Sequence, residues 1–163
     1  MSTGALLLAR LHDREQLVPA AEFLEHSDAV ECWSAVDGHV DLVAKLKAQP
    51  SELLSQIRAL GGEQELEVIE LANSSGTFLC GSSICYSCVF LEVEGARLEA
   101  VRDQLAALQE VMFCSLRAGT SELIAIVSGN SFQAIDRSIA ERIRPLDGVL
   151  RLKQDRVINL KQI

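Results

Sequence analysis

Hydrophobic and polar residues alternate along two stretches of the chain that share one layout. Residues 35–46 (AVDGHVDLVAKL) alternate up to a turn at residues 37–39 and then alternate again. Residues 116–127 (LRAGTSELIAIV) repeat this pattern, and Gly119 follows Gly38 by 81 residues. A period of two on either side of a glycine predicts a β-hairpin with one apolar face. The chain therefore contains two predicted hairpins.

The segments that flank the first hairpin have the period of a strand or of a helix. We expect strands at residues 4–11, 30–36 and 67–71, and helices at residues 13–24 and 50–60. Asp13 and Gln16 have the spacing of a capping box, which predicts the start of the first helix. Because Pro19 follows, either the first turn is irregular or the helix begins at Pro19. The predicted order is β-α-β-β-α-β.

The same order is expected a second time. Residues 81 apart match without gaps, as in the pairs Leu17 and Leu98, Leu24 and Leu105, Val30 and Val111, Cys32 and Phe113, Leu42 and Leu123, and Leu54 and Ile135. This register predicts an α+β fold of two tandem ferredoxin-like βαββαβ units, residues 1–76 and 77–163. Small residues at 73–76 and 81–83 predict a linker between them.

Each predicted sheet has helices on one face only. We assign Leu42, Ala44 and Leu46 to the helix side, which places Val43 on the opposite face. In the second unit that opposite face carries Ile124 and Ile126, and the strand at 84–93 is apolar on both faces. Because such strands are buried on both sides, we predict that the two sheets pack face to face, within the chain or between chains.

The composition gives a core without aromatic residues in quantity, at 48% apolar and 4% aromatic content. The net charge of −8 argues against direct nucleic-acid binding, since phosphate contacts need a basic surface. No targeting segment or membrane span is visible, so we expect a cytoplasmic protein. The basic residues Arg142, Arg144, Arg151, Lys153, Arg156 and Lys161 are interpreted as a solvated face, with a partner surface as the alternative.

Five cysteines without a secretion signal favour free thiols. The spacing of Cys80, Cys85 and Cys88, with Cys114 farther on, imitates that of [2Fe–2S] ligands. Cys85 and Cys88, however, fall at odd separation in a predicted strand and point to opposite faces. We therefore interpret the cysteines as buried hydrophobic residues and expect no metal and no cofactor.

The hairpin turns supply the candidate ligand contacts, which are Asp37, Gly38, His39 and Asp41 in the first turn and Gly119, Thr120, Ser121 and Glu122 in the second. Backbone N–H groups at a glycine turn suit a carboxylate, and Asp41 or Glu122 suits an ammonium group. The alternative is that each glycine only permits the turn through a positive φ. His39 and Asp41 also suit a surface metal or acid–base pair, although a solvated turn is the simpler interpretation.

The sequence resembles the effector-binding domain of the Lrp/AsnC family, also called the RAM domain. The resemblance lies in residues 30–43 (VECWSAVDGHVDLV), 116–124 (LRAGTSELI), 146–149 (LDGV) and 156–160 (RVINL). It covers nearly the whole chain as two tandem copies. The first copy lacks the Gly-Val turn of the family, and Glu122 replaces the motif's aspartate. A helix-turn-helix has no room before the first strand.

The resemblance implies a ferredoxin-like fold with paired sheets, and small ligands, typically amino acids, held near the hairpin glycine. We therefore predict a non-enzymatic, homo-oligomeric module that senses a small molecule, an amino acid in the first instance. No nucleophile motif, phosphate loop or dinucleotide fingerprint is present. Two alternatives stay open: a small enzyme on the related dimeric α/β-barrel, such as an oxygenase or a haem-handling protein, and an assembly module without a ligand.

Overall fold

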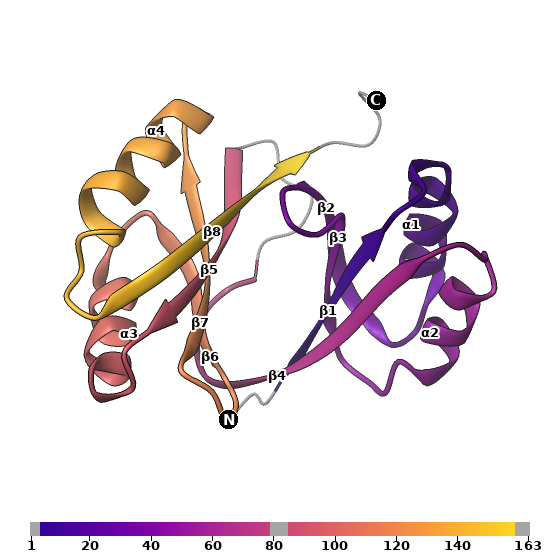
Figure 1. Cartoon of the computed structure of the whole chain (residues 1–163), viewed down its shortest axis with the longest axis horizontal. Coiled ribbons are helices and arrows are strands. Elements are labelled where there is room, and N and C mark those ends of the chain that lie inside the picture. The colour runs from indigo at the N-terminus through magenta and orange to yellow at the C-terminus, as the bar shows by residue number, and fades with distance from the viewer. Residues whose placement is uncertain (1–3, 79–84, 159–163) are drawn as a thin grey trace.

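We describe residues 4–78 and 85–158 of a computed structural model of the chain (Figure 1). The N-terminal half, residues 4–78, contains β1 (Ala5–Leu11), α1 (Leu17–His26), β2 (Val30–Asp37), β3 (Leu42–Leu46), α2 (Ser51–Arg58) and β4 (Gln64–Gly76). The C-terminal half, residues 85–158, contains β5 (Cys85–Val93), α3 (Leu98–Ala107), β6 (Val111–Arg117), β7 (Glu122–Gly129), α4 (Phe132–Ser138) and β8 (Val149–Ile158). The order β-α-β-β-α-β therefore occurs twice among the described residues.

The starts of the helices follow local rules. A short 3₁₀ turn, Arg14–Gln16, precedes α1, and Oδ1 of Asp13 accepts a hydrogen bond from the Glu15 N–H at 2.9 Å. The Gln16 side chain instead donates to the Leu60 carbonyl at 3.3 Å, so the predicted reciprocal capping box does not form. Pro19 lies in the first turn of α1, where backbone nitrogens need no helical partner.

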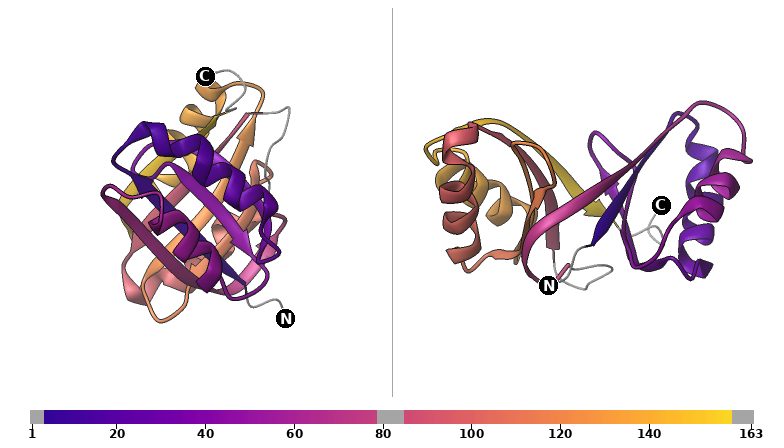
Figure 2. Two further views of the ribbon diagram at one scale, coloured as in Figure 1. Left: turned by 90° about the vertical axis from the view of Figure 1, so that its right-hand side faces the viewer. Right: turned by 90° about the horizontal axis from the view of Figure 1, so that it is seen from below.

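The described strands form one antiparallel sheet that closes on itself in the order β1-β3-β2-β8-β5-β7-β6-β4. Within each half the four strands are adjacent. The halves are joined where β2 pairs with β8, for example Val36 with Val157, and where β4 pairs with β6, for example Leu71 with Arg117. Figure 1 shows β8 and β4 crossing between the halves, and Figure 2 shows the helices outside the sheet at its two ends.

The prediction of two separate sheets is corrected by this closure. The two inner faces do lie opposite each other, but hydrogen bonds between edge strands make the sheets continuous. An edge strand presents a row of unpaired N–H and C=O groups, which pairing with the other half satisfies. The predicted linker at residues 73–76 is wrong for the same reason: these residues belong to β4, and Gly76 pairs with Phe113 of β6. Residues 81–83 lie outside the described part.

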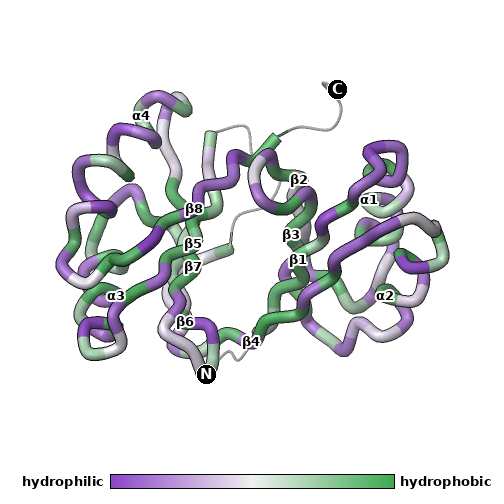
Figure 3. Tube along the Cα trace, viewed as in Figure 1, coloured by the Kyte–Doolittle hydropathy of each residue, from purple (hydrophilic) through white to green (hydrophobic). Residues whose placement is uncertain are grey.

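Three hydrophobic clusters fill the molecule, and Figure 3 shows apolar residues recurring along the strands of both halves. Two clusters lie between the sheet and the helices, one in each half. The third, the interior cluster, contains the buried residues Leu6, Leu8, Val36, Val40, Val43, Ile69, Leu71, Tyr86, Cys88, Phe113, Ile124 and Ile126. It takes side chains from both halves, so the inner faces are covered within a single chain.

The predicted division of the hairpin residues between the two faces is confirmed. Leu42, Ala44 and Leu46 pack with helix residues in the N-terminal cluster. Val43 and Ile124 lie in the interior cluster. No helix among the described residues is long and apolar enough to cross a membrane.

Candidate functional site

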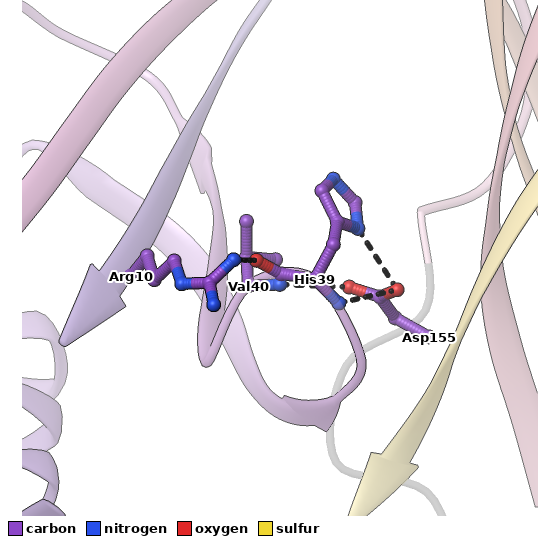
Figure 4. Close-up of polar contacts among 4 residues, drawn as sticks. All are labelled: Arg10, His39, Val40 and Asp155. Atoms are coloured by element: carbon purple, nitrogen blue, oxygen red, sulfur yellow. Dashed lines mark hydrogen bonds and ion pairs between the residues drawn. The ribbon is translucent and has the colours of Figure 1, made fainter. Parts of the chain in front are cut away.

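The first turn surrounds a carboxylate that belongs to the opposite half of the chain. Asp155 of β8 has a side chain that is only 1% exposed. Its Oδ1 accepts a hydrogen bond from the His39 backbone N–H at 3.1 Å, and its Oδ2 accepts one from the Val40 N–H at 3.3 Å. Figure 4 shows the turn and the His39 ring converging on this group. The turn therefore does receive a carboxylate, but an internal one.

The imidazole of His39 is held by the same carboxylate. Its Nδ1 lies 2.9 Å from Oδ1 of Asp155, and its ring meets the ring of Phe90 edge-on, with centroids 4.6 Å apart. The predicted pairing of His39 with Asp41 is wrong, because β8 brings Asp155 against the turn. With its Nδ1 fixed, the ring is oriented and only 29% of the side chain is exposed.

The glycine of the first turn is needed for close packing. A Cβ added at Gly38 would overlap the carboxylate of Asp155, so only glycine allows this approach. Gly38 is not among the glycines with positive φ, whereas Gly119 has φ of 75° and open space around its missing Cβ. The expectation of a positive φ is therefore confirmed at Gly119 and wrong at Gly38.

Asp41 and Asp37 do not face a shared ligand site. Oδ2 of Asp41 accepts the Leu11 N–H at 2.7 Å, and the Asp41 N–H donates to the Ala9 carbonyl at 2.9 Å. Asp41 thus connects the turn to β1, and one of its carboxylate oxygens already has a backbone partner. Asp37 is exposed at the end of β2, beside Arg156 in the strand register.

The second turn is closed by its own side chains. Thr120 Oγ1 donates to the Arg117 carbonyl at 2.9 Å and accepts the Glu122 N–H at 3.2 Å. Arg117 is paired with Glu122 at 2.9 Å and also with Glu67 of β4. The carbonyl of Ser121 accepts the Val93 N–H at 2.9 Å. The carboxylate of Glu122 therefore has an internal cationic partner.

The two turns do not form one site. Figure 1 places the β2–β3 turn in the upper centre of the molecule and the β6–β7 turn at the bottom, beside the N-terminal end. Each turn contacts the last strand of the opposite half, the first through Asp155 and the second through Glu67 and Glu70. Residues from the two turns therefore cannot contact the same small ligand.

A cleft of about 710 Å³ opens beside the first turn. Its walls come from β1, the β2–β3 turn, the end of α2, the start of β4, and β8, and consist of Leu8, Arg10, His39, Val40, Arg58, Gln64, Glu65, Leu66, Glu67 and Lys153. Of the eight turn residues predicted as ligand contacts, only His39 lines it. The others were missed because residues 10, 58 and 153 are far apart in the sequence and share no motif.

The charged groups of the cleft differ in how well they are paired. Arg10 donates from Nη1 to the His39 carbonyl at 3.2 Å. Within the described part of the chain, the side chains of Arg58 and Lys153 make no hydrogen bond or ion pair, and both are exposed. Of the two carboxylates, Glu67 is paired with Arg117, and Glu65 lies 3.9 Å from His12. The unpaired charge at the cleft is therefore positive.

The cysteines do not gather at a site. Cys88 lies in the interior cluster, whereas Cys85 and Cys114 lie on the helix side, as the strand alternation predicts. Burial, and then the nearby charge of Asp155, raise the pKa of Cys88 to about 12. Burial raises the pKa of Cys114 to about 11. The thiols of Cys85, Cys88 and Cys114 are free.

Cys32 departs from the expectation of free thiols, because it is disulfide-bonded. Cys80, which completes the iron–sulfur spacing, lies outside the described residues. Within those residues, no group of three or more His, Cys, Asp and Glu side chains has an arrangement that could hold a metal ion.

The family model for the Lrp/AsnC ligand binding domain matches residues 87–159, which run from β5 through β8. This match covers most of the C-terminal half. No curated protein matches the chain.

Several solved structures share the fold. The siroheme decarboxylase NirDL aligns with a TM-score of 0.74 and 12% identity, over 96% of this chain and 71% of that chain. A putative monooxygenase from Lactobacillus acidophilus aligns with a TM-score of 0.57 and 14% identity, over 96% and 94% of the two chains. A chlorite dismutase mutant from Candidatus Nitrospira defluvii gives 0.53 and 10%, over 98% and 92%. At these identities the similarity establishes the fold alone.

Proposed function

We propose that this protein is a small-molecule-binding module whose ligand occupies the cleft beside the first turn. The observation that carries the proposal is the cleft itself, about 710 Å³ in volume and lined by residues of both halves. This volume lies within the range of sites for small organic ligands. A ligand held there would contact Lys153 of β8 and Arg58 of α2 together, and so would report on the relative position of the halves.

A sensing role is supported by the match of residues 87–159 to the Lrp/AsnC ligand binding domain. An amino acid is the ligand that this resemblance suggests. The geometry of the first turn favours a different placement from the one expected, because Asp155 already occupies its N–H groups. An amino acid or a larger ligand would bind in the cleft, next to the turn.

We also propose that residues 1–76 and 77–163 are two copies of one unit. In support, α1 and α3 begin 81 residues apart, as do α2 and α4. A register shift between Val30 and Cys32 of β2 recurs between Val111 and Phe113 of β6, again 81 residues later. An oligomer would have to form through outer surfaces, because the inner sheet faces cover each other. We keep the proposals of cytoplasmic location and of no direct nucleic-acid contact, the latter from the net charge of −8.

Thermal unfolding in the presence of the twenty amino acids and a panel of small organic acids tests the binding proposal. A ligand that binds only the folded state adds about 2.7 kcal/mol of stability at a hundredfold excess over its Kd, which raises the melting temperature by several degrees. The binding proposal is wrong if no compound shifts the melting temperature of the natural protein.

An enzyme that acts on a tetrapyrrole is a second candidate, favoured by one specific observation. The fold match to siroheme decarboxylase NirDL extends over 96% of this chain, and that enzyme has also been solved with an iron-uroporphyrin III analogue. In this chain His39, Arg10, Arg58 and Lys153 line the cleft. Tyr86 lies in the interior cluster and Trp33 packs in the N-terminal cluster, so neither aromatic residue lines the cleft.

Absorption spectroscopy separates the two candidates. Titration with haemin and with siroheme should give a stoichiometric, saturable change in the Soret region if a tetrapyrrole binds in the cleft. Siroheme incubated under reducing, anaerobic conditions and followed by mass spectrometry should then lose carbon dioxide. If neither tetrapyrrole binds while small acids do, the enzyme candidate is rejected and the sensing module stands.

A further inference from the structure

The cleft beside the first turn carries basic side chains from four separate parts of the fold. Arg10 comes from β1, His39 from the β2–β3 turn, Arg58 from the end of α2, and Lys153 from β8. The protein as a whole has a net charge of −8, and the N-terminal half holds most of its acidic residues. A local positive site in an acidic chain is a device for attracting and holding an anion.

The acidic residues of the cleft do not cancel this charge. Glu67 is already paired with Arg117, which lies outside the cleft, and Glu65 faces His12. Arg58 and Lys153, in contrast, have no polar protein partner within residues 4–78 and 85–158. Their charges are therefore free to pair with groups of a ligand.

The internal contacts of the first turn restrict what kind of anion the cleft can hold. Phosphate groups favour backbone N–H groups and the N-terminal ends of helices. Here the N–H groups of His39 and Val40 are filled by Asp155. Arg58 ends α2, so the cleft meets the C-terminal end of that helix, where the helix dipole disfavours a dianion. Separate, singly charged carboxylates suit isolated Arg and Lys side chains better.

The remaining lining gives the body of the ligand. Leu8, Val40 and Leu66 contribute apolar surface to the cleft. His39 lies among them with its Nδ1 fixed by Asp155 and its ring against Phe90, which leaves the ring edge with Nε2 as the polar feature it can offer. A ligand that uses the whole cleft therefore combines an apolar body with several charged groups at its rim.

We propose that the cleft selects organic polycarboxylates, with an apolar body over Leu8, Val40 and Leu66, one carboxylate at Arg58 and another at Lys153. The inference rests on the proposed function, that the cleft binds a small molecule, and it names the chemical class. A single amino acid carries only one backbone carboxylate and fills a small part of about 710 Å³. Affinity should therefore rise with the number of carboxylates on a constant apolar frame.

Calorimetric titration with four aromatic probes tests the class directly. Benzoate, isophthalate and trimesate carry one, two and three carboxylates on the same ring, and trimethyl trimesate carries none that is free. We expect the Kd to fall at least fivefold from benzoate to isophthalate and again to trimesate, and trimesate binding to weaken as sodium chloride is raised. Inorganic phosphate should bind no better than benzoate.

Two variants and two matched controls locate the carboxylates. Arg58→Met and Lys153→Met each remove an unpaired cation, and we expect each to weaken trimesate binding about tenfold, which corresponds to about 1.4 kcal/mol. Arg137→Met removes an exposed arginine from the last turn of α4, as Arg58→Met does from α2. Lys47→Met removes an exposed lysine outside the cleft. Both controls should leave the trimesate Kd within twofold.

The outcomes separate the inference from the function on which it rests. Equal affinity for benzoate and trimesate, phosphate binding tighter than benzoate, or trimesate binding that survives both Arg58→Met and Lys153→Met, overturns the polycarboxylate class. If an amino acid or the neutral ester binds under those conditions, the binding module stands without it. If no probe, amino acid or ester binds at all, the proposed function fails together with the inference.

Discussion

The two hairpin turns have the same place in their halves but different chemistry. The first turn wraps its N–H groups around the buried carboxylate of Asp155, and its glycine makes room for that group. The second turn has an open glycine with positive φ and closes on its own threonine. A repeated backbone thus gives one turn that is locked to the opposite half and one that faces open space.

The strand register explains where the difference comes from. Leu8 of β1 and Phe90 of β5 hold matching places, because each pairs with the interior residue of a hairpin strand at the 81-residue spacing. Leu8 pairs on its other side with Glu67 of β4, and Phe90 pairs with Lys153 of β8. The charge at this position of the last strand is therefore reversed between the halves.

The same register places Ile69 in β4 where β8 has Asp155. Ile69 belongs to the interior cluster and cannot accept a hydrogen bond, whereas Asp155 accepts several. The second turn instead reaches β4 through Arg117, which pairs with Glu67. Two substitutions in the last strand are thus enough to give one end of the sheet a locked turn and an uncompensated positive cleft. The comparison shows that the last strands decide which turn becomes a site.

The largest expected effect is on stability, from Asp155→Asn compared with Glu122→Gln. Both changes remove a carboxylate charge with little change of shape. Asp155→Asn leaves a buried N–H without its acceptor and removes the charge beside His39, so we expect a loss of about 3 kcal/mol in the free energy of unfolding. Glu122→Gln weakens a partly exposed ion pair and should cost about 0.5 kcal/mol or less. Urea denaturation measures both, and similar losses would show that the two turns do not differ in this way.

The next effect comes from alanine at the two glycines. Gly38→Ala forces the Asp155 carboxylate out of its place, and we expect a loss of about 2 kcal/mol from the resulting overpacking. Gly119→Ala meets no atoms and carries only the cost of a positive φ, about 1 kcal/mol. The same denaturation experiment ranks them. A larger loss at Gly119 than at Gly38 would contradict the close packing described for the first turn.

A smaller effect is expected at the cysteine thiols. Burial and then the charge of Asp155 raise the pKa of Cys88 to about 12, while the charge of Asp155 is not among the causes that raise the pKa of Cys114 to about 11. Asp155→Asn should therefore speed alkylation of Cys88 at pH 9 and leave Cys114 unchanged, as peptide mass spectrometry can measure. Because a raised thiol pKa favours the protonated folded state, the stability that Cys88 supports should fall as pH rises from about 9 toward about 12.

That test needs a control for opening of the fold, since Asp155→Asn also lowers stability. Gly38→Ala displaces the same carboxylate without removing its charge and should speed alkylation of Cys88 less. Equal acceleration of Cys88 and Cys114 in Asp155→Asn would mean that unfolding, and not the charge of Asp155, exposes the thiols.

The sequence predicted the elements and the faces of the strands well, because both depend on local periodicity. The division of Val43 and Leu42 between interior and helix side follows from alternation alone. The closure of the sheet was not predictable in this way, since pairing of β2 with β8 and of β4 with β6 joins segments distant in the sequence. The small residues at 73–76 therefore suggested a linker, although they form the end of β4.

The candidate site was predicted only at His39. Its partner Asp155 had one usable signal, a carboxylate at an inward-facing position two residues before Val157 in an expected strand. The basic residues around it were interpreted as a solvated face, which hid the role of Lys153. Arg10 and Arg58 had no signal at all, because their meeting depends on the packing of α2 and β1 around the mouth of the sheet.

Chemical-shift mapping with trimesate tests most directly whether the cleft, and not either turn tip, is the ligand site. In ¹⁵N-labelled protein, we expect saturable shifts for the amides of His39, Val40, Arg58 and Lys153, and none for those of Gly119, Thr120 and Ser121. Shifts centred on Gly119, with the amides around Arg58 and Lys153 unmoved, would contradict a ligand site in the cleft.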